Sequence, residues 1–148
     1  MLVCAIAAAC LSDADKAAEL ERAADNLGMQ RNPVLDAPRL RLALLRNDHE
    51  HASELLHRIE ANQGWYLRGH GTSLATLIAR IDAHATLGHQ DQAERLATRL
   101  AVPGTFVQPF ALRALAVIRR DRVLLDQATA RFNDLDLAWH AKQTRLDP

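Results

Sequence analysis

The chain has 148 residues, enough to bury a hydrophobic core in one domain without disulfides or a metal ion. Hydrophobic residues make up 49% of it and charged residues 24%, and these proportions exclude a disordered tail and a membrane protein. Lysine and arginine together number 18, as do aspartate and glutamate, so the formal net charge of zero excludes a general attraction to nucleic acid or to an anionic membrane.

The first predicted helix runs from Leu2 to Leu11 and is apolar on almost every side. Cys4 and Cys10 lie six residues apart in it, on different faces, so we expect two buried thiols in a reducing cytoplasm. The segment resembles the apolar part of a signal peptide, but no basic residue precedes it and the helical pattern continues after it. We therefore expect a cytoplasmic protein in which this helix belongs to the fold.

Four segments share one layout: an apolar helix, a short polar or glycine-containing break, and an amphipathic second helix. The apolar residues of the second helices fall on the stripes Ala17, Leu20, Ala24 and Leu27; Ala52, Leu55, Leu56 and Ile59; Ala93, Leu96, Ala97 and Leu100; and Leu125, Ala128, Phe132 and Leu135. One first helix carries the facing stripe Leu74, Leu77, Ile78, Ile81 and Ala85. The layout predicts an all-α chain of about nine helices, the last from Leu137 to Leu146, in a single helical-repeat domain over residues 1–148.

Residues that cap and end helices occur where this layout needs them. Asp48, Ser73 and Asp121 are expected to cap helix starts, and Gly88 is expected to end a helix. The connection from Gly64 to Gly71 differs in composition from a plain turn because it carries Trp65 and Tyr66. These two aromatic side chains either anchor a partner or pack the loop onto neighbouring helices.

The stretch from Leu87 to Ala97 resembles the centre of a tetratricopeptide repeat, with Gly88 ending one helix and the small Ala93 five residues later. Asn47 to Ala52 and Ser12 to Ala17 repeat the spacing with polar residues in the glycine position. The three small residues recur at intervals of 35 and 41 residues, near that family's period. The resemblance implies helix pairs stacked into an α-solenoid, although His84 stands where an aromatic residue is common in the family.

The last forty residues are similar to the closing segment of large bacterial signalling regulators. The similarity covers Phe110 to Asp121, Leu124 to Phe132 and Leu137 to Arg145. Those regulators carry an adenylate-cyclase or LuxR-type DNA-binding domain, an ATPase domain and a tetratricopeptide-like tail. The resemblance implies that this chain corresponds to the tail.

Motifs of enzyme chemistry are missing from the sequence. It has no glycine-rich phosphate loop, no Gly-x-Ser-x-Gly, no His-Glu-x-x-His and no Cys-x-x-Cys. His49, His51 and His57 cluster around one helix start, but no cysteine or acidic triad completes a zinc site, so we expect solvated histidines. We expect a non-catalytic protein without catalytic, cofactor-binding or metal-binding residues.

Opposite charges concentrate on different helices of the pairs. Arginines, among them Arg39, Arg41, Arg80 and Arg113, lie on first helices, whereas most acids lie on second helices. First helices line the concave surface of such solenoids, so the pattern permits a basic groove for an acidic peptide, the alternative being ordinary solvated faces. Arg80 and Arg113 lie beside the apolar stripe, and reversing their charge is expected to leave the core intact.

The two ends of the predicted array differ. The closing helix offers the polar residues His140, Lys142 and Gln143, whereas the first helix offers none. An end repeat needs a polar outer face. We therefore expect the first helix to be covered, either by earlier repeats or by a second copy of the chain in a homodimer.

These observations favour a protein-protein interaction or regulatory module, the helical-repeat tail of a multidomain bacterial signalling or transcription-regulatory protein. Its expected partners are a protein or peptide of acidic character, or other domains of the same protein. The expected partner-binding residues are Arg39, Arg41, Arg80, Arg113, Trp65 and Tyr66. The alternative function is a small-molecule sensor with a pocket between repeats, near Trp65, Tyr66 and His84.

Overall fold

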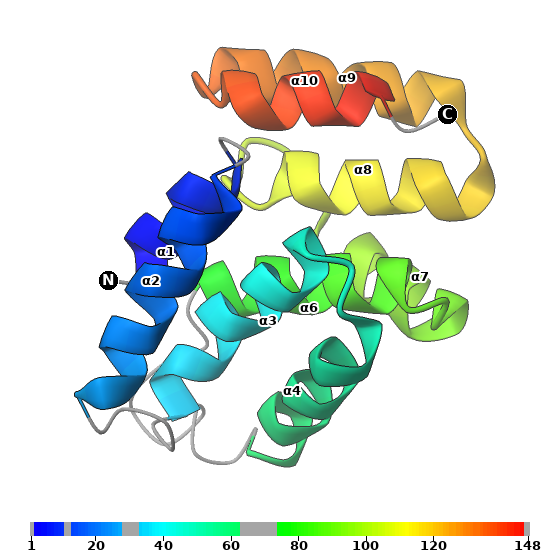
Figure 1. The fold of residues 1–148 in the computed structure, drawn as a ribbon. Coiled ribbons are helices and arrows are strands. Elements are labelled where there is room, and N and C mark those ends of the chain that lie inside the picture. The colour runs from blue at the N-terminus through cyan, green and yellow to red at the C-terminus, as the bar shows by residue number, and fades with distance from the viewer. Residues whose placement is uncertain (1, 11–12, 28–32, 63–73, 147–148) are drawn as a thin grey trace. The chain divides into compact units, whose positions relative to one another are not determined.

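A computed structural model describes residues 2–10, 13–27, 33–62 and 74–146, and every regular element in these ranges is helical (Figure 1). The α-helices are α1 (Leu2–Cys10), α2 (Ala14–Asn26), α3 (Asp36–Leu45), α4 (His49–Ala61), α6 (Leu74–Thr86), α7 (Gln90–Leu100), α8 (Gln108–Arg119), α9 (Arg122–Asp134) and α10 (Ala138–Leu146). A 3-10 turn, η1 (Pro33–Leu35), precedes α3. The all-α prediction is confirmed for the described ranges, as are the first and last helices to within two residues.

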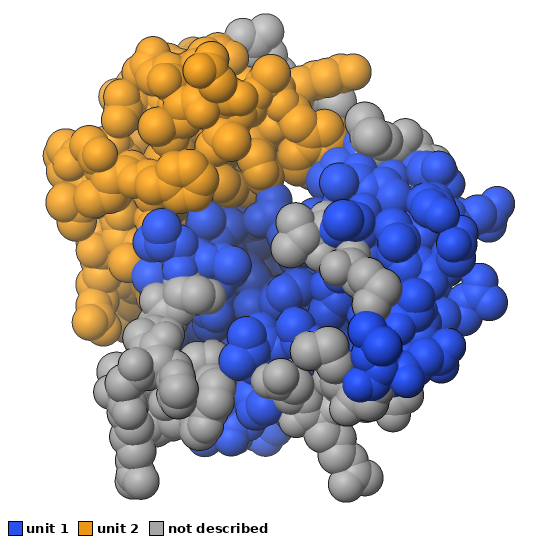
Figure 2. Space-filling view, turned by 90° about the vertical axis from the view of Figure 1, so that its left-hand side faces the viewer, with its two compact units in different colours: residues 1–83 blue, residues 84–148 orange. Residues whose placement is uncertain are grey.

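The chain divides into two compact units, residues 1–83 and residues 84–148 (Figure 2). In the first unit, α1 packs against α2 and α3, and α3 packs against α4. In the second unit, α8 packs against α7 and α9, and α10 packs against α9. The boundary between the units falls within α6, near its C-terminal end. The grouping of residues 1–148 as one domain stays a prediction.

The first unit has a small apolar core where α1, α2 and α3 meet. Leu2, Ala5, Ala24 and Leu42 are buried there, and partly buried side chains such as Ile6 pack against them. The expectation of two buried thiols is wrong. Cys4 is exposed and Cys10 is half-buried, and both are free. The physical reason is that the packing of α1 against α2 and α3 buries Leu2, Ala5 and Ala8 and leaves Cys4 exposed.

One turn geometry recurs in five helix connections, those before α2, α4, α7, α9 and α10, whereas the connection between α7 and α8 differs. The backbone N–H of the residue just before a helix donates to the carbonyl oxygen five residues earlier, and its own carbonyl accepts from the N–H four residues later. The first hydrogen bond measures 2.9 Å in every case, from Asp13 to Ala8, Asp48 to Ala43, His89 to His84, Asp121 to Ala116 and Leu137 to Phe132. Paired bonds of this kind satisfy carbonyl groups that a helix end would otherwise leave unpaired.

The turn requires that the residue immediately before the helix-capping residue adopts the left-handed backbone conformation, with a positive φ. Where that residue is described it is Asn47, Gly88, Arg120 or Asp136, with φ between 52° and 77°. Glycine, asparagine and aspartate adopt this conformation readily. Arginine does not, and its presence is the one departure from turn chemistry among these positions.

Aspartate side chains supply most of the predicted caps. Asp48 accepts from the N–H of His51 at 3.1 Å, and Asp121 accepts from Val123 and Leu124 at 2.8 and 3.2 Å. Each carboxylate satisfies backbone donors at a helix start, as predicted. Gly88 follows the end of α6 with φ 77°, as expected, whereas Ser73, the remaining predicted cap, lies outside the described residues.

The small residues of the repeat are buried in the described helices. Ala17, Ala52 and Ala93 are completely buried, and each stands four residues after the capping residue of its turn. The predicted stripes are correct over most of their length. Leu27 and Leu74 are the exceptions, with 64% and 52% exposure, because one follows the end of α2 and the other begins α6.

Candidate partner-binding surface

The structure places the predicted arginines mainly in contacts within the fold. The Arg39 side chain is only 7% exposed and its guanidinium lies 2.7 Å from the Asp25 carboxylate. The Arg80 side chain is 17% exposed, with Nη2 3.6 Å from Glu60. Trp65 and Tyr66 lie outside the described residues.

The ion pairs of Arg39 and Arg80 occupy equivalent positions in the sequence. Asp25 and Glu60 each lie eight residues after the buried alanine of their own helix. Arg39 and Arg80 each lie thirteen residues before the buried alanine of the next second helix. Each pair therefore joins a second helix to the first helix that follows it, and the same connection occurs between α2 and α3 and between α4 and α6.

Two further arginines join helices over a longer stretch of chain. Arg46 pairs with Glu21 at 2.5 Å, and Arg119 pairs with Glu94 at 2.8 Å. In both pairs the residues are 25 positions apart and the arginine lies two residues before a capping aspartate. These side chains are more exposed than that of Arg39, so each pair contributes little to stability by itself.

Asp36 and Arg58 form an ion pair in which the acid lies on a first helix, α3, and the arginine on a second helix, α4. Asp36 is buried in the first turn of α3, and its carboxylate accepts from Arg58 on α4 at 2.7 Å. An unpaired carboxylate at this depth would lose most of its hydration, and the guanidinium replaces part of it. The start of α3 thus carries ionic contacts to both α2 and α4.

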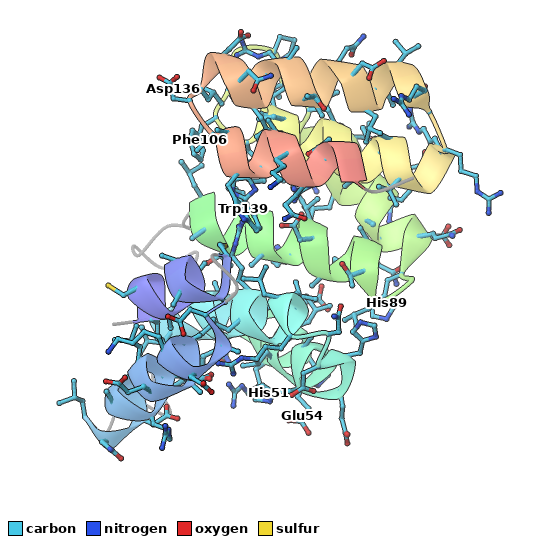
Figure 3. The ribbon with its side chains drawn as sticks, turned by 45° about the horizontal axis from the view of Figure 1, so that its top comes forward. His51, Glu54, His89, Phe106, Asp136 and Trp139 are labelled. Atoms are coloured by element: carbon cyan, nitrogen blue, oxygen red, sulfur yellow. The ribbon has the colours of Figure 1, made fainter. Side chains whose placement is uncertain are left out.

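Arg113 is held by aromatic rings in the second unit. Its guanidinium carbon lies 5.7 Å from the centroid of the Phe110 ring and 5.5 Å from that of Phe132. These rings meet edge to face at 4.9 Å, and His140 stacks on Phe132 at 5.3 Å. Trp139, beside His140 on α10, meets its ring edge to face (Figure 3). A cation over two rings stabilises the packing, so charge reversal at Arg113 would disturb the core, contrary to the prediction.

Arg41 is half-buried and lies near Cys10. Partial burial raises the pKa of the Cys10 thiol above its ordinary value, and the positive charge of Arg41 opposes that shift. The thiol is therefore protonated at neutral pH and a poor nucleophile.

His84 and His89 form a contact that the sequence did not reveal. His84 is 4% exposed and its Nδ1 lies 3.3 Å from Nδ1 of His89, which occupies the capping position before α7 without capping it (Figure 3). The three described caps with a side-chain hydrogen bond are aspartates, so His89 gives up that role and faces His84 instead. His84 is the residue whose carbonyl oxygen accepts the hydrogen bond of the turn, and the other turns carry alanine or phenylalanine at that position. Its contact with His89 accounts for a buried histidine there.

The most prominent group of exposed arginines lies at the turn between α8 and α9. Arg119, Arg120 and Arg122 are all exposed there, and Val117 and Val123 beside them are 49% and 65% exposed. From the sequence, arginines on first helices were considered as a group, and this surface was not singled out. The available signal was the run Arg-Arg-Asp-Arg from residue 119 to residue 122, which lies between Val117 and Val123. A solvated turn does not require apolar side chains beside its charged residues.

Comparisons with known proteins give no match. No family model, curated protein or solved structure is significantly similar to the chain. Over the described residues, no three metal-ligating side chains gather into a group, and no described helix has the length and apolar character to cross a bilayer.

The Asp25–Arg39 pair provides a direct test of the ionic connection between α2 and α3. A double-mutant cycle with Asp25→Asn and Arg39→Met should show a coupling of about 0.5–1.5 kcal/mol in urea unfolding, because the arginine is desolvated while the aspartate is one-third exposed. The cycle Arg122→Gln with Asp126→Asn, at a pair 82% and 71% exposed, should give less than about 0.5 kcal/mol. Equal couplings in the two cycles would mean that burial of Arg39 does not strengthen its ion pair.

Proposed function

We propose that this chain is a non-catalytic protein-binding module of helical-repeat type, similar to tetratricopeptide proteins. The observation that carries the proposal is the recurring turn, which places a left-handed residue, a helix start and, before α4, α7 and α10, a buried alanine in the same order along the chain. The equivalent ion pairs of Arg39 and Arg80 support it, because the same inter-helix contact occurs at equivalent positions of two successive repeats. Repeated helix pairs of fixed geometry present an extended, rigid surface to a partner.

The proposed partner is a protein or peptide of acidic character, or another domain of the protein to which this chain belongs. The arginines of the first helices would attract this partner through the positive charge that remains after pairing with acidic residues of the same chain. Among them, Arg113 lies over the rings of Phe110 and Phe132, which hold its guanidinium in place for a contact with a carboxylate of the partner. In this proposal the chain serves as the tail of a bacterial signalling or transcription-regulatory protein and acts by binding alone.

Neutral replacements test the first-helix arginines with less damage to packing than charge reversal. The variant Arg80→Gln with Arg113→Gln should capture less protein partner than the native chain, in about 50 mM salt where contacts between exposed charges are strongest. The matched control is Arg95→Gln with Arg99→Gln, which removes the same charge from exposed positions on α7. Melting temperatures of both variants are measured first, and binding is compared well below the lower one.

Two outcomes would contradict the proposal. If the Arg80 and Arg113 variant and its control bind a partner equally, the first-helix arginines do not form the binding surface. If immobilised native chain, cross-linked and analysed by mass spectrometry, enriches no protein above a heat-denatured control, the protein-binding function itself is wrong.

A further inference from the structure

We infer that the turn between α8 and α9 is a second binding surface, specific for an acidic protein segment that carries an apolar side chain. The surface consists of Val117, Arg119, Arg120, Arg122 and Val123, and we call it the arginine–valine surface. This inference rests on the proposed protein-binding function and adds a location and a partner chemistry. All five residues belong to one unit of the chain.

Arg120 is the central residue, because its side chain has no role in the turn that holds it. Its φ and ψ of 52° and 43° place it in the left-handed region, where a bulky side chain is strained. The same position holds asparagine, glycine or aspartate in the other described turns, and these residues tolerate the conformation. The guanidinium of Arg120 makes no hydrogen bond or ion pair with the described part of the chain. The backbone hydrogen bonds of the turn hold Arg120 in this conformation, and its side chain adds no hydrogen bond or ion pair within the described chain.

The neighbouring acids do not neutralise the surface. The Asp121 carboxylate points into the start of α9, where it accepts from the backbone N–H groups of Val123 and Leu124. Glu94 pairs with Arg119 at 2.8 Å, and Asp126 approaches Arg122 at 3.6 Å on the solvent-exposed face. Positive charge thus remains at the turn, centred on Arg120, and a carboxylate on a partner would complement it.

The two valines decide between an acidic protein and a nucleic acid. Val117 and Val123 are 49% and 65% exposed, on either side of the arginines in sequence. A phosphate backbone offers such side chains nothing to pack against, whereas an acidic peptide with an apolar residue satisfies both features of the surface. With one unpaired arginine and two others partly neutralised, the charge is also too small for tight phosphate-backbone binding.

The experiment uses the full chain and a fluorescein-labelled peptide of four Glu-Glu-Val repeats. Its counterparts are a peptide of four Gln-Gln-Val repeats and a twelve-nucleotide oligothymidylate. Fluorescence anisotropy should show that the Glu-Glu-Val peptide binds more tightly than either. The variant Arg120→Gly should weaken this binding about tenfold, since it removes a charged hydrogen-bond donor.

The same variant should not lose stability. Glycine relieves the strain at φ 52°, so its melting temperature should rise by about 2–4 °C. Arg120→Lys, which keeps the charge, should retain part of the binding, and Arg95→Gln, which removes an exposed charge from α7, should bind like the native chain. Weaker binding together with higher stability distinguishes a contact residue from a structural one.

Several results would overturn the inference. They are equal binding by the native chain and Arg120→Gly, tighter binding of the oligothymidylate than of the Glu-Glu-Val peptide, or a lower melting temperature for Arg120→Gly. If this inference is overturned but the Arg80 and Arg113 variant captures less partner than its control does, the proposed function still holds. Conversely, if the Arg80 and Arg113 variant captures a partner as well as its control does but the peptide binding depends on Arg120, the first-helix surface fails and this one stands.

Discussion

Replacing Phe132 with alanine should lower the free energy of unfolding by about 3–5 kcal/mol, the largest effect expected from a single substitution in this chain. Phe132 on α9 is completely buried. Its ring contacts Phe110, His140 and the guanidinium of Arg113, so truncation removes apolar burial and leaves three partners around a cavity. Urea unfolding monitored by circular dichroism measures the change.

Phe106→Ala is the matched control for this prediction. Phe106 precedes α8, is 44% exposed, and lies 6.0 Å from Phe110 between ring centroids (Figure 3). Its truncation leaves no closed cavity and should cost less than about 1 kcal/mol. Similar losses for the two variants would show that Phe132 is not the centre of the second unit's core.

Replacing Ala93 with phenylalanine should destabilise the chain by about 1–3 kcal/mol through overpacking. Ala93 is completely buried in the first turn of α7, where its backbone N–H donates to the carbonyl oxygen of His89 at 2.9 Å. No side chain larger than alanine fits without displacing its neighbours. The melting temperature should fall by about 2–4 °C for each kcal/mol lost.

The exposed neighbour Gln92 supplies the comparison for Ala93. Gln92→Phe adds the same ring to the same helix on its solvent-exposed face and should change stability by less than about 0.5 kcal/mol. An unchanged melting temperature for Ala93→Phe would mean that Ala93 does not lie at a close helix approach, and it would remove one argument for the repeat.

Local features of the fold were predictable because they depend on neighbouring residues. Asp48 and Asp121 precede apolar stripes, and Gly88 precedes a helix start with a small residue five positions on, so short-range capping and turn chemistry located these elements. The exposure of Leu27 and Leu74 was not predictable, because the periodicity of apolar residues does not show at which residue the packing between two helices ends.

The candidate site was much less predictable than the fold. The sequence placed arginines on first helices and acids on second helices, and both positions are correct for Asp25 and Arg39, and for Glu60 and Arg80. The interpretation as a free basic groove did not anticipate that these charges pair with one another. Pairing depends on which helices become neighbours, and residues 14 or 20 positions apart carry no local signal of it.

By itself, the sequence determined that the described chain is helical, where its first and last helices lie, and that the alanines of the second-helix stripes are buried, because hydrogen bonding and side-chain entropy act within a few residues. Only the tertiary structure decided that Arg39 and Arg80 are held by acids, that Arg113 lies over two rings, and that Arg120 has no partner in the described chain while bearing a strained backbone. The physical reason is that the energy of a charged side chain depends on its solvation and on the charges brought near it in space, and distant segments of the chain set both.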